Sequence, residues 1–169
     1  MDFVGIIPLY TVILCHDHWK PYYTYNQCFH SLCNAHHLRE LDFSFEKEGQ
    51  KWAKEISELL IKANVQVNEE GGKLQNESQK VYLEKYREIL SNAETECPPP
   101  DESKRLPKQR GRLKRSKSRN LLERLIDYES DVFRFMTNEN VPFTNNQGER
   151  DIRMVKVQQK ISGCFRSFE

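Results

Sequence analysis

The sequence lacks the features of an exported or membrane-spanning protein. Its longest apolar stretch, residues 4–15, is interrupted by Pro8 and preceded by Asp2, and it is shorter than the roughly 20 residues that a membrane span needs. Five cysteines at irregular spacing do not form the even-numbered pattern of a disulfide framework. We therefore expect free thiols, a cytoplasmic location and no membrane partner.

The chain also lacks an excess of charge of one sign, but its charges are unevenly distributed. It has 26 basic and 25 acidic residues, yet residues 104–119 hold nine basic residues and no acid. Together with the prolines at 98–100, this composition predicts a mobile linker over residues 97–119. Two interpretations stay open: a solvated linker that binds nothing in particular, or a segment that contacts nucleic acid through Arg110, Arg112, Lys114 and Arg115.

The remaining pattern predicts an α/β protein with a core. The chain has 169 residues, of which 37% are hydrophobic. Residues 11–15 predict an interior strand covered on both faces, and residues 29–33 predict a second strand. Helical spacing predicts helices over 34–67, capped by Asn34 and broken near Gly49, and over 78–93 and 117–137. A final helix begins near Asn146, after Pro142.

Two carboxylates are candidates for metal ligation. Asp17 directly follows the first predicted strand, at the edge where α/β sheets place ligands. Glu149 lies in the first turn of the last helix, on the same face as Arg153, Lys156 and Lys160. A carboxylate beside cations suits a divalent ion next to a polyanion. The alternatives are turn chemistry for Asp17 and a capping box with Asn146 for Glu149.

Two further groups of residues have both a functional and a structural interpretation. Cys28, Cys33 and His36 have the spacing of a partial zinc site, but the second ligand pair is missing, so we expect zinc to be absent and Cys33 to be a core thiol. Four aromatic residues close to Asp17 either stack on an unpaired base or serve in packing. These are Trp19, Tyr22, Tyr23 and Tyr25.

Three segments together resemble the insertion-sequence-66-type bacterial transposases. They are residues 16–22 (HDHWKPY), residues 32–41 (LCNAHHLREL) and residues 141–167, and the resemblance covers nearly the whole chain. It implies a ribonuclease-H-like fold with a helical insertion, an Asp-Asp-Glu triad with Mg²⁺ (or Mn²⁺), and transposon ends and target DNA as partners in a bacterial, nucleoid-associated setting.

The resemblance also assigns roles. Asp17 resembles the second aspartate of the triad and Glu149 its glutamate. Supporting motif residues are Asn145, Asn146, Cys33 and His36, and the DNA backbone is positioned by Arg150, Arg153, Lys156 and Lys160. The implied organisation is a partial core over residues 1–45, a helical insertion over 46–119 and carboxyl-terminal helices over 120–169.

The chain departs from the family pattern in two ways. Asp2 is the only acid before Asp17 and does not suit the first aspartate, and Gly148 stands where alanine is expected, which weakens the first helical turn by up to about 1 kcal/mol. We therefore expect a truncated, inactive catalytic domain that depends on a missing amino-terminal segment or on self-association. Alternatives are a non-catalytic DNA-binding remnant and a small zinc-structured interaction protein.

Overall fold

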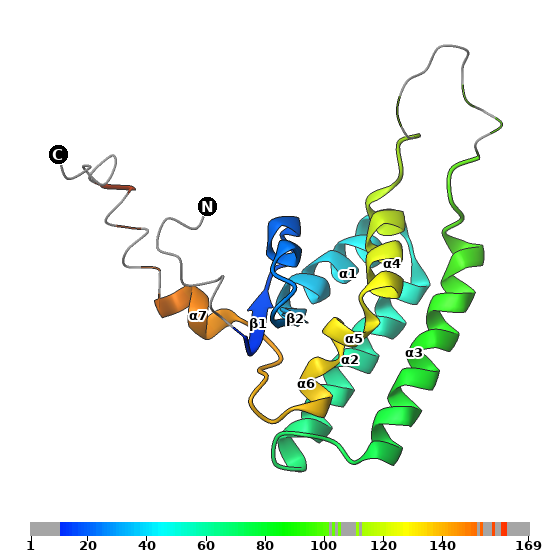
Figure 1. The fold of residues 1–169 in the computed structure, drawn as a ribbon. Helices are drawn as coiled ribbons and strands as arrows, with labels where there is room; N and C mark the ends of the chain where they lie inside the picture. The colour runs from blue at the N-terminus through cyan, green and yellow to red at the C-terminus, as the bar shows by residue number, and fades with distance from the viewer. Residues whose placement is uncertain are drawn as a thin grey trace.

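The computed structural model describes residues 11–101, 103, 105, 111, 113–151, 153, 157, 160 and 161, except for the side chain of Glu149. Helices and a small sheet follow one another along the chain (Figure 1). The elements are β1 (Ile13–His16), the 3-10 helix η2 (Lys20–Thr24), β2 (Phe29–Leu32), α1 (Asn34–Glu48), α2 (Lys51–Glu69), α3 (Asn76–Glu96), α4 (Lys117–Asp127), α5 (Glu129–Val132), α6 (Arg134–Thr137) and α7 (Asn146–Asp151).

Strands β1 and β2 are parallel, with Ile13 opposite Phe29 and His16 opposite Leu32. Both predicted strands exist, although β1 lies one to two residues further along the chain than expected. The prediction that β1 is covered on both faces is wrong within the described part of the chain, because only His16 of its four residues is buried. Just before β1, Val12 is 60% exposed.

Helices α1 and α2 form where one long helical pattern was predicted, and they are separated at Gly49 as expected. Gly49 has φ 69°, a left-handed conformation that favours glycine, and its N–H donates to the carbonyl oxygen of Phe45. Asn34, predicted as the cap of this helix, is instead its first residue, and the preceding Cys33 makes no side-chain capping bond. The amide of Asn34 donates to the Val132 carbonyl oxygen, 3.1 Å away.

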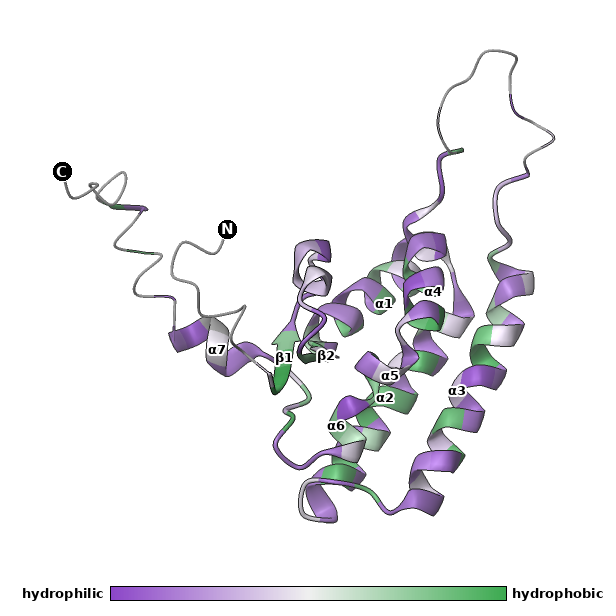
Figure 2. Cartoon of the chain, viewed as in Figure 1, coloured by the Kyte–Doolittle hydropathy of each residue, from purple (hydrophilic) through white to green (hydrophobic). Residues whose placement is uncertain are grey.

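The core is formed by helix faces that were visible in the sequence. On α2 the buried residues Trp52, Ile56 and Leu60 follow one another at four-residue spacing, and α3 repeats this spacing with Tyr82 and Tyr86. In Figure 2 hydrophobic and hydrophilic residues alternate along these helices, as expected for amphipathic elements. The hydrophobic core therefore lies mainly in the helical part of the molecule.

The single helix predicted over residues 117–137 is wrong, because the chain forms three helices there, interrupted at Tyr128 and Phe133. The interruptions serve tertiary contacts. The Tyr128 ring packs 4.4 Å from the His18 ring, and the Val132 carbonyl oxygen becomes available to Asn34. Local periodicity continues through the breaks, so it gave no sign of them.

The predicted α/β class is confirmed at a coarse level: the described chain is mostly helical and contains a small parallel sheet. No helix in the described ranges is both long and apolar enough to cross a membrane.

Candidate functional site

Asp17 occupies a tight turn directly after β1. Its carboxylate Oδ1 accepts a hydrogen bond from the backbone N–H of Trp19, 3.2 Å away, and the residue is exposed. Between them His18 has φ 65°, and it is the only described residue other than glycine with a positive φ. Such a conformation is unfavourable for a histidine and persists where surrounding contacts enforce it.

The side chain of buried His16 provides such a contact. Its Nδ1 accepts a hydrogen bond from the backbone N–H of His18 at 3.1 Å, so the proton of the neutral ring lies on Nε2, which faces His30 Nδ1 at 3.1 Å. Burial, reinforced by the neighbouring His30, lowers the pKa of His16 to about 4. The ring is therefore neutral at physiological pH and available as an acceptor for this turn.

A second network fastens the end of the sheet to α5 and α6. The Tyr23 hydroxyl donates to Asp131 at 3.2 Å, and Asp131 forms an ion pair with Arg134 at 3.0 Å. Arg134 in turn donates from Nε to the carbonyl oxygen of His30 in β2. Burial raises the pKa of Tyr23, and the charge of Asp131 raises it further. The phenol therefore stays protonated and serves as a structural donor.

The segment before α7 returns to the end of β2. The backbone N–H of Asn34 donates to the carbonyl oxygen of Phe143 at 3.0 Å, and that of Asn145 donates to the Cys33 thiol sulfur at 3.1 Å. Both bonds join the β2–α1 junction to the residues just ahead of α7. They set the start of α7 beside the strand ends.

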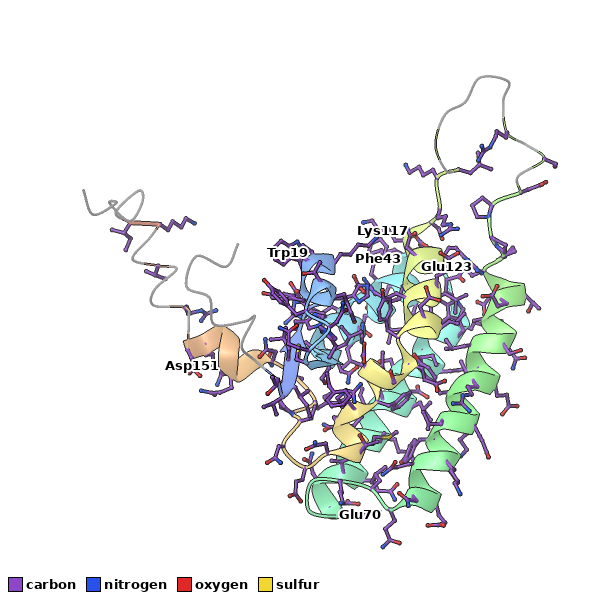
Figure 3. All side chains as sticks on the ribbon, in the orientation of Figure 1. Trp19, Phe43, Glu70, Lys117, Glu123 and Asp151 are labelled. Carbon is purple, nitrogen blue, oxygen red and sulfur yellow. The ribbon has the colours of Figure 1, made fainter. Side chains whose placement is uncertain are left out.

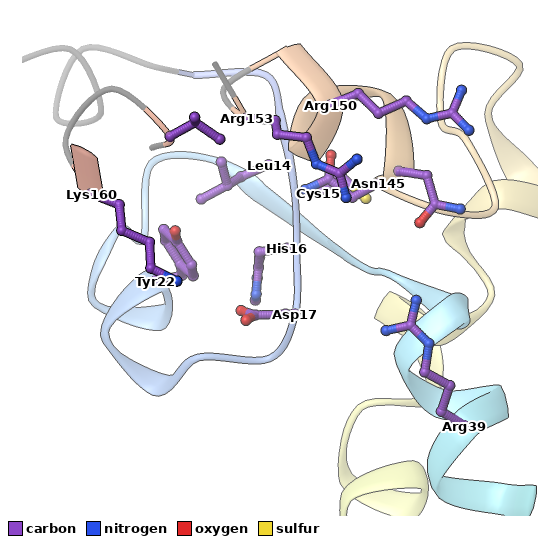
Figure 4. Close-up of a pocket in the computed structure, with 12 residues that line it drawn as sticks. Leu14, Cys15, His16, Asp17, Tyr22, Arg39, Asn145, Arg150, Arg153 and Lys160 are labelled. Carbon is purple, nitrogen blue, oxygen red and sulfur yellow. The ribbon is translucent and has the colours of Figure 1, made fainter. Parts of the chain in front are cut away.

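A cleft of about 710 Å³ lies between β1, α1 and the α7 region (Figure 4). Asp17 is the only carboxylate among the described residues that line it, and four described cations share the lining. The lining residues are Leu14, Cys15, His16, Asp17, Tyr22, Arg39, Asn145, Asn146, Arg150, Arg153, Val157 and Lys160. The cleft thus brings one acid and a surplus of positive charge together from the two ends of the chain.

This cleft suits a phosphate-rich ligand. The exposed guanidinium groups of Arg150 and Arg153 and the exposed ammonium group of Lys160 attract anions from one side, and Arg39 on α1 lines the other. Asp17 makes no ion pair with a described cation, so its carboxylate is available to an added cation.

The model of the Transposase IS66 family matches residues 3–169 of the chain. The chain belongs to this family. No curated protein and no solved structure matches it. The predicted resemblance is thus confirmed, and the cleft is a site on an IS66 family transposase chain.

In this IS66 family chain several predicted site residues meet, and the side chains of two others lie outside the described residues. Asp17, Asn145, Asn146, Arg150, Arg153 and Lys160 all line the cleft. Glu149 belongs to α7, but its side chain lies outside the described residues, as does Lys156 altogether. The prediction that Glu149 and Asp17 share a metal ion therefore stays a prediction.

Gly148, one residue before Glu149, has a local reason to be glycine. A Cβ atom at this position would lie 2.7 Å from Oδ1 of Asn145, well inside van der Waals contact. The departure from the expected alanine thus makes room for the side chain of Asn145, which lines the cleft.

The described ends of the basic segment lie apart from the cleft. In Figure 1 the end of α3 and the start of α4, which flank the segment, lie on the opposite side of the molecule from α7. Arg115 forms an ion pair with Glu123, whereas Lys114 is exposed. Arg110 and Arg112 lie outside the described residues. Arg115 is therefore engaged within the fold, and the described ends of the segment do not flank Asp17.

Cys28, Cys33 and His36, the residues of the alternative zinc interpretation, do not form a metal site in the described part of the chain, where no group of three acids, histidines and cysteines could hold a metal ion. Cys28 donates from its thiol to the carbonyl oxygen of Tyr25 at 3.4 Å. Cys33 accepts the bond from Asn145. His36 lies in the first turn of α1, where Cys33 precedes it. Both thiols thus form hydrogen bonds within the fold.

Among the cleft residues that sequence reasoning missed, Arg39 and His16 matter most for its chemistry. Arg39 lies in a helix of mixed charge, and nothing in its spacing separates it from an ordinary solvated cation. His16 lies next to Asp17, but its acceptor role depends on the turn that only the structure shows. The available signals were the positions of Arg39 within the motif residues 32–41 and of His16 within the motif residues 16–22.

Proposed function

We propose that this chain forms part of a ribonuclease-H-like catalytic domain of a DNA transposase that uses Asp-Asp-Glu chemistry. In this proposal Asp17 and Glu149 are two of the three metal-binding carboxylates, DNA is the substrate, and the cations of the cleft hold its backbone. The carrying observation is that Asp17, at a strand end, shares one cleft with Asn145, Asn146 and Arg150, the sequence neighbours of Glu149. Membership in a transposase family supports DNA as the partner.

The residues of the cleft fit a divalent cation in part. Asp17 offers a hard oxygen ligand: Oδ1 accepts one backbone hydrogen bond, and Oδ2 has no hydrogen-bond partner among the described residues. A complete ligand set is not present among the described residues. When bound, Mg²⁺ or Mn²⁺ would activate the attacking oxygen and stabilise the leaving oxygen of a phosphodiester. The family makes such an ion the expected cofactor.

The cations of the cleft would bind the phosphates of the DNA backbone. Arg150 and Arg153 present planar donor groups that suit the two free oxygens of a phosphodiester, and Lys160 adds a point charge. Contacts of this kind position a DNA strand without reading its sequence. Arg39 would hold the same strand from the α1 side, opposite the α7 region.

Two carboxylates do not complete a two-metal site, so we expect a third acid from another segment or another protein chain. DNA cleavage by the 169-residue chain alone should then be weak. Efficient Mg²⁺-dependent strand transfer by the purified chain would contradict this expectation.

The proposal is tested by Mn²⁺ titration of the purified chain, with calorimetry as the readout. Asp17→Asn and Glu149→Gln should each weaken Mn²⁺ binding by about tenfold or more, because each removes a charged ligand. The matched control is Asp151→Asn, an exposed carboxylate of α7 that bonds to Gln147 and does not line the cleft. Equal affinities in all four proteins would refute the assignment.

A second candidate function is DNA binding without catalysis. It is favoured by the surplus of four described cations over one described carboxylate in the cleft. Under this alternative, labelled DNA binds equally well with and without Mn²⁺, and Asp17→Asn strengthens binding by removing a repelling charge. Under the catalytic proposal, Mn²⁺ strengthens DNA binding in the unmodified chain and has no such effect in Asp17→Asn.

A further inference from the structure

The four aromatic residues that follow Asp17 have different environments. Tyr23 is engaged inside the molecule, since its hydroxyl donates to Asp131 and its ring lies 4.6 Å from the ring of His30. Tyr22 instead lines the cleft, and Trp19 lies next to Tyr22 and is open to solvent. Packing accounts for Tyr23 and leaves these two rings to be explained.

Trp19 is linked closely to the candidate site. Its backbone N–H bonds to the carboxylate of Asp17, and 41% of the residue is exposed. Figure 3 shows its side chain at the outer end of η2, directed away from the core. The chain therefore holds a large aromatic ring in solvent beside the acid that the proposed function uses, although exposure of a tryptophan is normally unfavourable.

Tyr22 joins this ring to the cleft. The Trp19 and Tyr22 rings meet edge to face, with centroids 5.3 Å apart and planes at 77°. Tyr22 lines the cleft and lies 4.9 Å from the ring of buried His16. The two rings form an aromatic corner, defined here as Trp19 and Tyr22, whose inner member borders the cleft and whose outer member is open to solvent.

The geometry points to a stacking site for an unpaired nucleobase at the aromatic corner. A base that has left the duplex exposes both of its faces, whereas a base inside a duplex is covered by its neighbours, so only the former stacks on Trp19. The cations of the cleft complement the phosphates of the same strand, and exposed Lys20 follows Trp19 directly. This inference rests on the proposed function for the identity of the ligand as DNA.

Charge favours this ligand over an apolar segment of another protein. The cleft that Tyr22 borders presents Arg150, Arg153 and Lys160, which an apolar peptide would leave without partners. A nucleotide satisfies both features, because its base covers the ring and its phosphate meets the cations.

Tryptophan fluorescence provides a direct test. The chain has two tryptophans, and Trp52 is buried with 2% exposure, so a ligand that stacks on a ring affects Trp19. Three DNA ligands are compared in buffer that contains a chelator and no metal. They are a blunt duplex, the same duplex with a short unpaired overhang, and the same duplex with an abasic overhang of equal length. We expect quenching with the normal overhang and little with the other two.

Binding to the three ligands is then measured for two variants. Trp19→Ala should weaken binding to the normal overhang by about fivefold or more, since stacking on one base contributes at least about 1 kcal/mol, and should leave the blunt duplex unaffected. Phe45→Ala is the matched control, because Phe45 is 40% exposed on α1 and does not line the cleft. Its binding should equal that of the unmodified chain.

Several results would overturn the inference: equal quenching by blunt and overhanging DNA, quenching that persists without bases, no quenching by any DNA, or a Trp19→Ala chain that binds all three ligands as before. Quenching by an apolar peptide but not by the overhang would assign the corner to a protein partner instead. Failure of the proposed metal chemistry is distinguishable, because it would appear as unchanged Mn²⁺ affinity in Asp17→Asn while stacking persists.

Discussion

Lowering the pH from 7 to 5 should destabilise this protein, and buried His37 should contribute to the loss alongside His16 and His18, whose pKa values are lowered as well. His37 is 2% exposed in α1, and its Nδ1 lies 3.1 Å from Oδ1 of Asn34. Because the amide of Asn34 donates to Val132, its oxygen is the acceptor, so the proton of neutral His37 lies on Nδ1. Burial, with the nearby charge of Arg124, lowers the pKa of His37 from 6.5 to about 3.

The direction and the magnitude of the pH effect on stability follow from this lowered pKa. Above pH 6.5 the histidine is neutral in both the folded and the unfolded chain, and its contribution to stability is complete. As the pH falls from 6.5 toward the folded pKa, only the unfolded chain takes up the proton, so the free energy of unfolding decreases by about 1.4 kcal/mol per pH unit. Between pH 7 and 5, His37 alone lowers the free energy of unfolding by about 2 kcal/mol.

Urea unfolding at pH 7, 6 and 5, followed by the fluorescence of buried Trp52, measures this loss. His37→Asn keeps a donor near the Nδ1 position and removes the titration. Between pH 7 and 5 this variant should therefore lose about 2 kcal/mol less stability than the unmodified chain loses. Leu41→Ala, one turn further along α1 and fully buried, is the control, since it destabilises the core without changing the pH slope. Equal slopes in the unmodified chain and His37→Asn would refute the reasoning.

Two further predictions concern the cleft. His16→Asn keeps an acceptor near the Nδ1 position and should preserve slow hydrogen exchange of the His18 amide, whereas His16→Gln should accelerate it by about fivefold, the loss of about 1 kcal/mol of hydrogen bonding. Similar exchange rates in the two variants would contradict the acceptor role. Gly148→Ala should stabilise an Asn145→Ala chain by up to about 1 kcal/mol and help the unmodified chain less, because the new Cβ displaces Asn145 Oδ1. Thermal unfolding measures both effects, and equal gains in the two backgrounds would count against the steric explanation.

Local rules were sufficient for the elements that depend on local chemistry. The four-residue spacing of Trp52, Ile56 and Leu60 predicted α2, and Gly49 predicted its boundary with α1. The break at Tyr128 escaped prediction, because it is stabilised by contacts with residues more than a hundred positions earlier in the chain, such as the ring of His18. Sequence periodicity carries no information about such partners.

The residues of the site likewise divide into those that local sequence predicts and those that depend on tertiary packing. Asp17 was predicted from its place after a strand, Arg153 from its place on one face of the last helix, and Arg150 from the family resemblance; all three line the cleft. The ion pair of Arg115 with Glu123 and the approach of Arg39 depend on how helices pack, so charge patterning alone did not separate a structural cation from one that lines the cleft.

The two bonds that join Cys33 and Asn34 to the residues ahead of α7 also set an order of assembly. The wall of the cleft that contains Arg39 is synthesised more than a hundred residues before the wall that contains Arg150, and the bonds to Phe143 and Asn145 form only after those residues have left the ribosome. Until then Asp17 faces open solvent without the cations of the α7 region. A nascent chain therefore has no complete anion-binding cleft until the α7 region has been synthesised.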